Sequence, residues 1–247
     1  ETCEQLANQG LLSATGPDLE DSRAGLLVVL TAIQAERGQL AAATSGLAEA
    51  EGIFNRLRNK RAHCVVLCNL AELLLWQGEI GEGLRRGKEA LTMAADVDFH
   101  VGSAAALRVI SMAQMDAGDL NAAGSSLTRA LAYGEEQAGV DMVATRFLCG
   151  RLALRMGDPI SSIKHIDSGL LSCGEGDPEM YASLLSAMKG RAFVIAGQDE
   201  LGKKTLDEAK GMLEGVAVPR RTQVLVVLAL GYQALEENEH ALRLARE

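Results

Sequence analysis

The sequence is poor in the residues that build β-rich and disulfide-bonded domains. Aromatic residues make up 3% of the 247 positions, and there are only four prolines. Strands favour aromatic and β-branched residues, so this composition argues against a β-rich fold and suits long helices in close contact. The five cysteines are odd in number and lack the regular spacing of a disulfide framework. They therefore predict free thiols in a reducing, cytoplasmic setting.

Long apolar runs and an excess of positive charge are also missing. The longest apolar run is far shorter than the roughly 18 residues of a membrane span, and the start of the chain lacks the pattern of a signal peptide. The net charge of −9 argues against nucleic acid as the main ligand of the whole surface. We expect neither a membrane nor nucleic acid as a partner. Because the chain starts without Met and stops part-way through a helical pattern, we also expect it to be a piece of a longer protein.

A short turn phrase recurs along the chain at a fixed period. Each copy has a glycine between two apolar stretches, as in Gly118-Asp119, and successive glycines are 40, 40, 39 and 40 residues apart. A period in this range predicts stacked helical repeats. The turn glycines are Gly38, Gly78, Gly118, Gly157 and Gly197.

The apolar spacing around these turns predicts alternating helices. A helix of a preceding pair is expected over 1–13. The first helices of six pairs are expected over 19–37, 60–77, 99–117, 139–156, 178–196 and 219–235. Their second helices are expected over 40–56, 80–96, 120–137, 159–173, 199–214 and 238–247. The sixth pair has Glu236 at the turn in place of glycine.

Small residues recur in register on both helices of each pair, which would let the helix axes approach closely. Seven residues before the turn glycine stand Thr31, Ala71, Ser111, Gly150 and Gly190. Twelve residues after it stand Ala50, Ala90, Ala130, Gly169 and Ala209. A chance helical bundle would not repeat its small residues in this way.

This pattern resembles the tetratricopeptide repeat, which has a small residue at the eighth place, glycine at the turn and small residues at the twentieth and twenty-seventh places. One unit holds Ala71, Gly78, Gly83 and Ala90 there. The period of about 40 is longer than the usual 34, and the proline that ends each unit of the family is absent. The resemblance implies an all-α, right-handed superhelical α-solenoid of antiparallel helix pairs. It would cover 1–247 as a single TPR-like array of about six pairs plus one N-terminal helix.

In that family, the second, fifth, ninth, twelfth and thirteenth places of the first helices line a groove that holds a partner segment. Arginine suits carboxylates and phosphates, and methionine and aromatic residues would add adaptable apolar contacts. The alternative is that the arginines pair with local acids and the methionines belong to the core. The resemblance implies a groove lined by Glu72, Trp76, Arg108, Met112, Met115, Phe147, Arg151, Arg155 and Arg191.

The function implied is a non-enzymatic interaction module that binds a protein or peptide segment, with an acidic group held by the arginines. The alternative is a ligand-sensing arm of a larger signalling ATPase, kinase or transcription regulator, because long-period arrays look like the sensor or docking arms of bacterial regulators. We find no catalytic constellation and expect no cofactor or metal. The exposed apolar ends of the array leave homodimerisation open.

Two weaker motifs favour structural explanations. Residues 81–88 distantly resemble a phosphate-binding loop, but the stretch lies within an expected helix and Glu89 replaces the Ser or Thr that would meet magnesium. His63, Cys64 and Cys68 place two sulfur atoms one helical turn apart, whereas a closed zinc site needs four ligands. A buried core position is the favoured interpretation of both cysteines.

A basic stretch lies at one junction between repeats. It could bind phosphate or an acidic partner, although a solvated loop is the favoured interpretation. Its members are Arg56, Arg58, Lys60 and Arg61.

Overall fold

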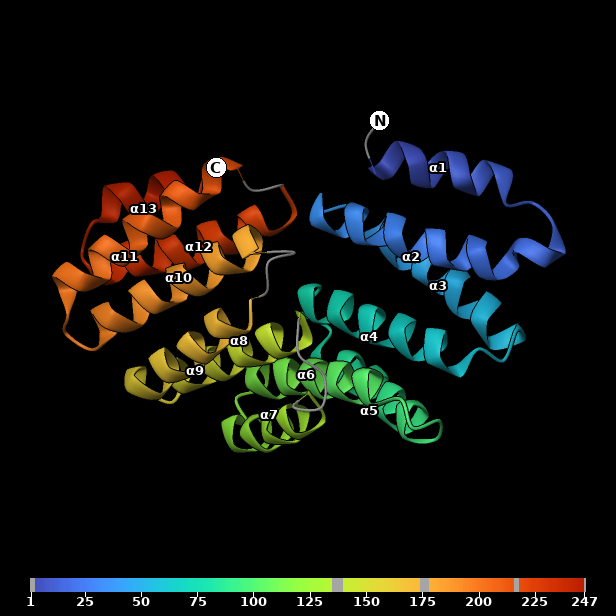
Figure 1. Cartoon of the computed structure of the whole chain (residues 1–247), viewed down its shortest axis with the longest axis horizontal. Helices are drawn as coiled ribbons and strands as arrows, with labels where there is room; N and C mark the ends of the chain where they lie inside the picture. Colours follow the sequence, from blue (N-terminus) through green and yellow to red (C-terminus); the bar gives the residue numbers. More distant parts are fainter. Residues whose placement is uncertain (1–2, 135–139, 174–177, 216–217, 247) are drawn as a thin grey trace. The chain divides into compact units, whose positions relative to one another are not determined.

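The computed structural model describes residues 3–134, 140–173, 178–215 and 218–246, and in these ranges the chain is helical with no strand. It forms two compact units, Glu1–Tyr133 and Gly134–Glu247. Each unit is described by itself below, and the expectation of a single array over 1–247 stays a prediction. The fold is a TPR-like stack of antiparallel helix pairs, as the repeat predicted (Figure 1).

Unit 1 contains a first helix and three helix pairs. The second helix of one pair packs on the first helix of the next, as α3 does on α4 and α5 does on α6. The first helices α4 and α6 also contact each other. The elements are α1 Cys3–Ser13, the 3-10 helix Pro17–Leu19, α2 Glu20–Glu36, α3 Leu40–Arg56, α4 Lys60–Trp76, α5 Ile80–Ala95, α6 His100–Asp116 and α7 Leu120–Gly134.

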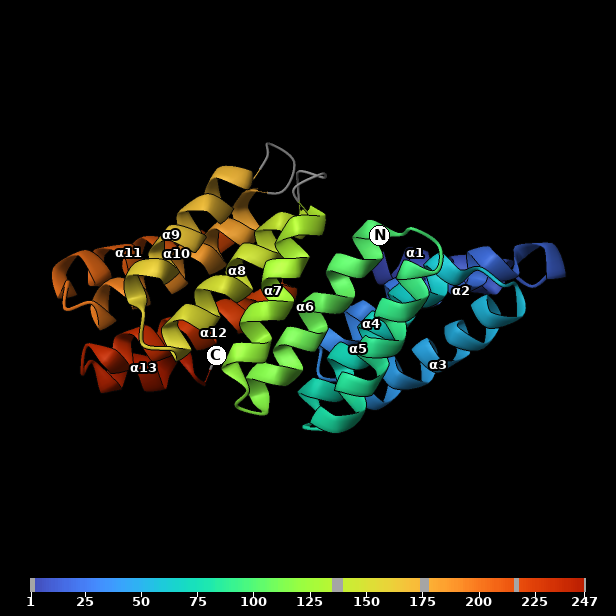
Figure 2. The same cartoon turned by 90° about the horizontal axis from the view of Figure 1, so that it is seen from below.

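Unit 2 contains three helix pairs, which Figure 2 shows from a second side. The pairs are α8 with α9, α10 with α11 and α12 with α13, and α10 contacts both other first helices, α8 and α12. The elements are α8 Val140–Arg155, α9 Pro159–Ser172, α10 Pro178–Ile195, α11 Asp199–Gly211, the 3-10 helix Met212–Gly215, α12 Val218–Ala234 and α13 Asn238–Leu244.

The predicted turns are confirmed by their backbone geometry. All five turn glycines have φ between +73° and +83°, a region that residues with a Cβ rarely adopt. Glu236 occupies the sixth turn with φ of +62°. At the second turn the Glu79 N–H donates to the Leu74 carbonyl over 2.8 Å, the bond that ends a helix in a Schellman motif. After the fourth turn, Asp158 caps α9 by accepting from the Ser161 N–H at 2.9 Å.

The expected helix boundaries agree with the structure to within a few residues. The helices expected over 199–214 and 238–247 end three residues early, at Gly211 and Leu244, and after Gly211 the chain continues as a 3-10 helix over Met212–Gly215. Residues 1–2, 135–137, 139 and 247 of the expected helices lie outside the described residues.

The small residues predicted to allow close helix packing are buried in both units. Ala71, Ala90 and Ala209 have no exposed surface. At Gly150 a Cβ atom would lie 3.0 Å from Cγ1 of Ile166, in the second helix of the same pair. The small residues that recur in the sequence therefore lie where the two helices of a pair contact each other.

Candidate binding surface on the first helices

Two predicted groove arginines lie next to each other in unit 2. Arg151 on α8 and Arg191 on α10 both occupy the ninth place of their repeat, and both are partly buried. Burial, and then the like charge of Arg151, lower the pKa of Arg191. Within the described residues, no hydrogen bond or ion pair joins Arg191 to an acid. The two guanidinium groups therefore form a positively charged pair that an anionic group would stabilise.

The groove positions of unit 2 are basic, apolar or uncharged polar. The second, fifth, ninth and thirteenth places of α8, α10 and α12 include three arginines and no acid. Three apolar side chains among them are exposed, namely Ile195 at 43%, Val226 at 53% and Leu230 at 38%. Sequence reasoning missed Val226 and Leu230, although they stand at the fifth and ninth places of the sixth pair and could have been found by extending the same count. The twelve positions are Ala144, Phe147, Arg151, Arg155, Leu184, Ala187, Arg191, Ile195, Gln223, Val226, Leu230 and Ala234.

The corresponding residues of unit 1 form a surface of mixed charge. Arg108 lowers the pKa of the Cys68 thiol and Glu72 raises it, so both charges lie close to this thiol. Trp76, at the end of α4, is 43% exposed, and Met112 is partly buried against the core. Arg108 thus has an acid in its surroundings.

Met115 requires a correction, because it is fully buried and cannot line an open surface. It stands at the twelfth place, and Leu75 and Val194 at the same place are also buried, each 7% exposed. The contacts explain this burial, since Leu75 packs on Gly83 in α5 and Val194 packs on Gly202 in α11. The twelfth place therefore points toward the second helix of its own pair and belongs to the core.

The other predicted groove residues have partly or fully exposed side chains, divided between the two units. Unit 1 holds Glu72, Trp76, Arg108 and Met112, and unit 2 holds Phe147, Arg151, Arg155 and Arg191. The arginine stripe predicted from Arg108 to Arg191 crosses the division between the units, and it stays a prediction.

The two neighbouring cysteines of α4 occupy core positions, as the sequence favoured. Cys64 is fully buried and its Sγ lies 3.4 Å from the Ala90 carbonyl oxygen. A hydrogen bond between the thiols lowers the pKa of Cys64 and, together with burial, raises that of Cys68. In the described part of the chain, no three His, Cys, Asp or Glu side chains converge as metal ligands would.

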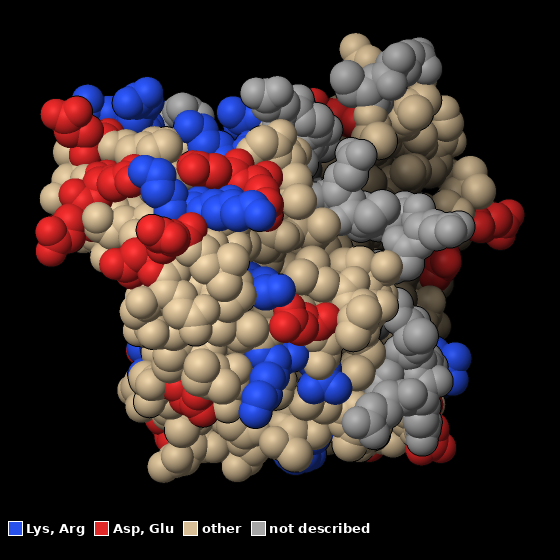
Figure 3. Space-filling model, turned by 60° about the vertical axis from the view of Figure 1, so that its left-hand side comes forward, with Lys and Arg blue, Asp and Glu red and all other residues tan. Residues whose placement is uncertain are grey.

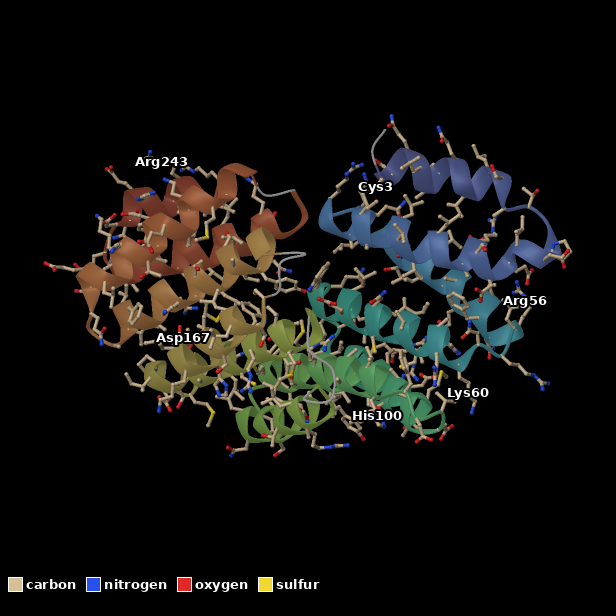
Figure 4. The ribbon with its side chains drawn as sticks, in the orientation of Figure 1. Cys3, Arg56, Lys60, His100, Asp167 and Arg243 are labelled. Carbon is tan, nitrogen blue, oxygen red and sulfur yellow. The ribbon has the colours of Figure 1, made fainter. Side chains whose placement is uncertain are left out.

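Two residues of the basic stretch at the α3–α4 junction form ion pairs with the other helix of their own pair. Arg56 pairs with Glu20 at 3.3 Å, and Lys60 pairs with Asp96 at 3.3 Å. Figure 4 labels Arg56 and Lys60 near the ends of their helices. Both ion pairs are exposed, and such pairs contribute little to stability. This geometry fits the solvated junction better than a phosphate site.

Residues 81–88 lie inside α5, so they form no phosphate-binding loop. Arg86 of this stretch reaches Glu51 of α3 at 2.9 Å, and Arg85 pairs with Glu82 at 2.5 Å. On the face drawn in Figure 3, basic and acidic side chains are likewise interspersed.

No family model matches this sequence, and no curated protein matches it. Solved structures do resemble it. The Rap conjugation gene regulator of plasmid pLS20, in complex with the Phr* peptide, aligns with a TM-score of 0.74 and 13% identity over 99% of this chain and 67% of its own. A Rap protein complexed with competence and sporulation factor aligns with a TM-score of 0.73 and 19% identity over 92% and 63%. BtubC from P. vanneervenii aligns with a TM-score of 0.68 and 16% identity over 87% and 92%.

At these identities the similarity supports the TPR-like fold alone. The structures also include aspartyl phosphate phosphatase F from Bacillus subtilis, of whose length this chain covers 58%. The chain thus spans about three-fifths of that phosphatase and of the Rap protein bound to competence and sporulation factor. Among the helices in the described residues, none is both long and apolar enough to cross a bilayer.

Proposed function

We propose that this chain is a non-enzymatic interaction module and that the first helices of unit 2 bind a protein or peptide segment carrying a carboxylate. Two of the similar structures, both of Rap proteins, are complexes, one with the Phr* peptide and one with competence and sporulation factor. The observation that carries the proposal is the neighbouring pair of Arg151 and Arg191, whose partly buried like charges repel each other, so that a carboxylate bound beside them would relieve the repulsion.

The first test is charge reversal of the pair. A double variant with Arg151→Glu and Arg191→Glu should bind acidic peptides, selected from a random display library by the unmodified chain, at least about tenfold more weakly. The affinity of the unmodified chain should also fall as salt rises from 50 to 500 mM, because exposed charges are screened. Fluorescence anisotropy with the selected peptides measures both effects.

Arg243 and Arg246 provide a control with the same change in net charge. Both lie at the exposed C-terminal end of unit 2, and Figure 4 labels Arg243. The double variant Arg243→Glu and Arg246→Glu should bind like the unmodified chain. Equal affinities for all three proteins would refute the arginine pair as the binding site.

A second candidate is a ligand-sensing arm of a larger regulator. The observation that favours it is the similarity to the pLS20 conjugation gene regulator, of whose length this chain covers 67%. A ligand present at 100 times its Kd would stabilise the folded chain by about 2.7 kcal/mol. We therefore expect a screen of peptides and small metabolites to include compounds that raise the Tm by several degrees. A screen in which the Tm is constant at millimolar ligand would count against this candidate.

The remaining expectations about partners and location belong to the same proposal. Interaction with an acidic segment would need neither nucleic acid nor a membrane. A cytoplasmic location fits the cysteines, all five of which are free thiols. Homodimerisation stays open, and the oligomeric state can be measured by light scattering.

A further inference from the structure

A single leucine lies behind the groove positions of two neighbouring first helices. Leu206 of α11 is fully buried. A Cβ atom at Gly190 of α10 would lie 2.8 Å from its Cγ, and one at Gly231 of α12 would lie 2.7 Å from its Cδ2. Leu206 therefore fills the space between these two glycines and holds α10 and α12 at a fixed separation.

The residues beside these glycines are groove residues. Arg191 follows Gly190, and Leu230 precedes Gly231. The glycines face Leu206 in the core, whereas the Leu230 side chain is 38% exposed and Arg191 is partly exposed. Together with Arg151, these two residues occupy the ninth place of three successive first helices. We call Arg151, Arg191 and Leu230 the ninth-place row.

The ninth-place row combines charge with an apolar end. Its first two members are the neighbouring cations described above, and its third is an exposed leucine with Val226, 53% exposed, one helical turn away. Such a surface matches a ligand that presents a carboxylate to the arginines and a large apolar side chain to α12. A ligand with only one of these groups would leave half of the row unused.

The separation of α10 and α12 determines how far apart the carboxylate and the apolar side chain of the ligand must be. Helices in contact have axes about 8–10 Å apart, so Arg191 and Leu230 present their groups at about that separation. An extended polyproline II segment rises about 9 Å in three residues and returns to the same side after three. We propose that unit 2 selects an extended segment in which a carboxylate residue and a large apolar residue stand three positions apart. This inference rests on the proposed function and specifies its ligand.

The experiment measures the spacing directly. The probes are fluorescein-labelled ten-residue peptides of glycine, serine and alanine that contain one glutamate and one leucine. The leucine is placed one to seven positions away from the glutamate, in both directions. We expect anisotropy titrations to give the highest affinity at a spacing of three in one direction, about fivefold above spacings of one and two.

Two variants test the contact with the leucine of the peptide and the contact with its glutamate separately. Leu230→Ser should abolish the preference for a spacing of three while binding still depends on glutamate. Arg191→Gln should abolish the dependence on glutamate. The matched controls are Leu242→Ser and Arg243→Gln on α13, where Leu242 is 58% exposed, and both should behave like the unmodified chain. Circular dichroism checks that all four variants fold.

The outcomes separate this inference from the proposed function. Binding that depends on glutamate and Arg191 but not on the leucine spacing would overturn the inference and leave the proposed function in place. A preference for a spacing of seven, which two turns of helix would give, would also overturn it, because the ligand would then be helical. Binding that depends on neither glutamate nor leucine would overturn both.

Discussion

The Gly202→Val variant is expected to lose at least about 3 kcal/mol of unfolding free energy. A Cβ atom at Gly202 would lie 3.0 Å from the Gly190 carbonyl oxygen and 3.0 Å from the Val194 backbone nitrogen, and closer still to the Val194 side chain. Backbone atoms cannot rotate away as a side chain can, so α10 and α11 would have to separate. Urea denaturation followed by circular dichroism measures the loss as a lower midpoint.

Gly211 is the control for this substitution because it lies on the same helix. A Cβ atom there would have no neighbour within 4 Å. The Gly211→Ala variant should change the unfolding free energy by less than about 0.5 kcal/mol. If Gly202→Val unfolds at the same urea concentration as Gly211→Ala, α10 and α11 do not approach as closely as the structure has them.

The close approach at Gly202 shows why the repeat was visible in the sequence. Small residues at fixed places are needed wherever two helix backbones meet, and positive φ at the turn favours glycine. Both requirements depend on residue size and backbone conformation, and glycine meets the second at five of the six turns. Even the sixth turn, where Glu236 replaces glycine, was placed correctly because its neighbours Ala229 and Ala241 kept the register.

The candidate surface was harder to predict than the fold. Side chains leave a helix all round its axis, so two nearby positions can face either the groove or the core. The resemblance to the tetratricopeptide repeat placed Met115 in the groove together with Met112, and the two side chains leave α6 in directions only about 60° apart. Only the contacts of the twelfth place with the second helix show that it belongs to the core. The sequence likewise located Arg151 and Arg191, but not which charges surround them, since acids reach a surface from several helices.

The sequence carries no mark of the two compact units Glu1–Tyr133 and Gly134–Glu247, and the expectation of a single array over 1–247 stays a prediction. The spacing of the turn glycines there differs from the others by only one residue, because 39 residues separate Gly118 from Gly157 and 40 separate the other neighbours. A repeat period records how each helix pair is built.

The second large effect is expected for Leu206→Ala, which should destabilise the chain by about 4 kcal/mol, in the upper range for a buried leucine. Leu206 lies between Gly190 and Gly231, and neither glycine has a side chain that could move into the space. The cavity would therefore persist unless α10 and α12 move together. Chemical denaturation measures the loss, and Leu201→Ala is the control, because Leu201 is 44% exposed on the same helix and should cost less than about 1 kcal/mol.

Leu206→Ala also tests whether packing in the core affects peptide binding. If α10 and α12 move together to fill the cavity, the separation of Arg191 and Leu230 changes, although neither residue is substituted. Leu206→Ala should then weaken the preference for peptides with a spacing of three at a temperature where the variant is still folded. Hydrogen exchange should show faster opening of α10 and α12 than in Leu201→Ala. A variant that loses stability but keeps the full spacing preference would mean that Leu206 supports the fold without setting the geometry of the ninth-place row.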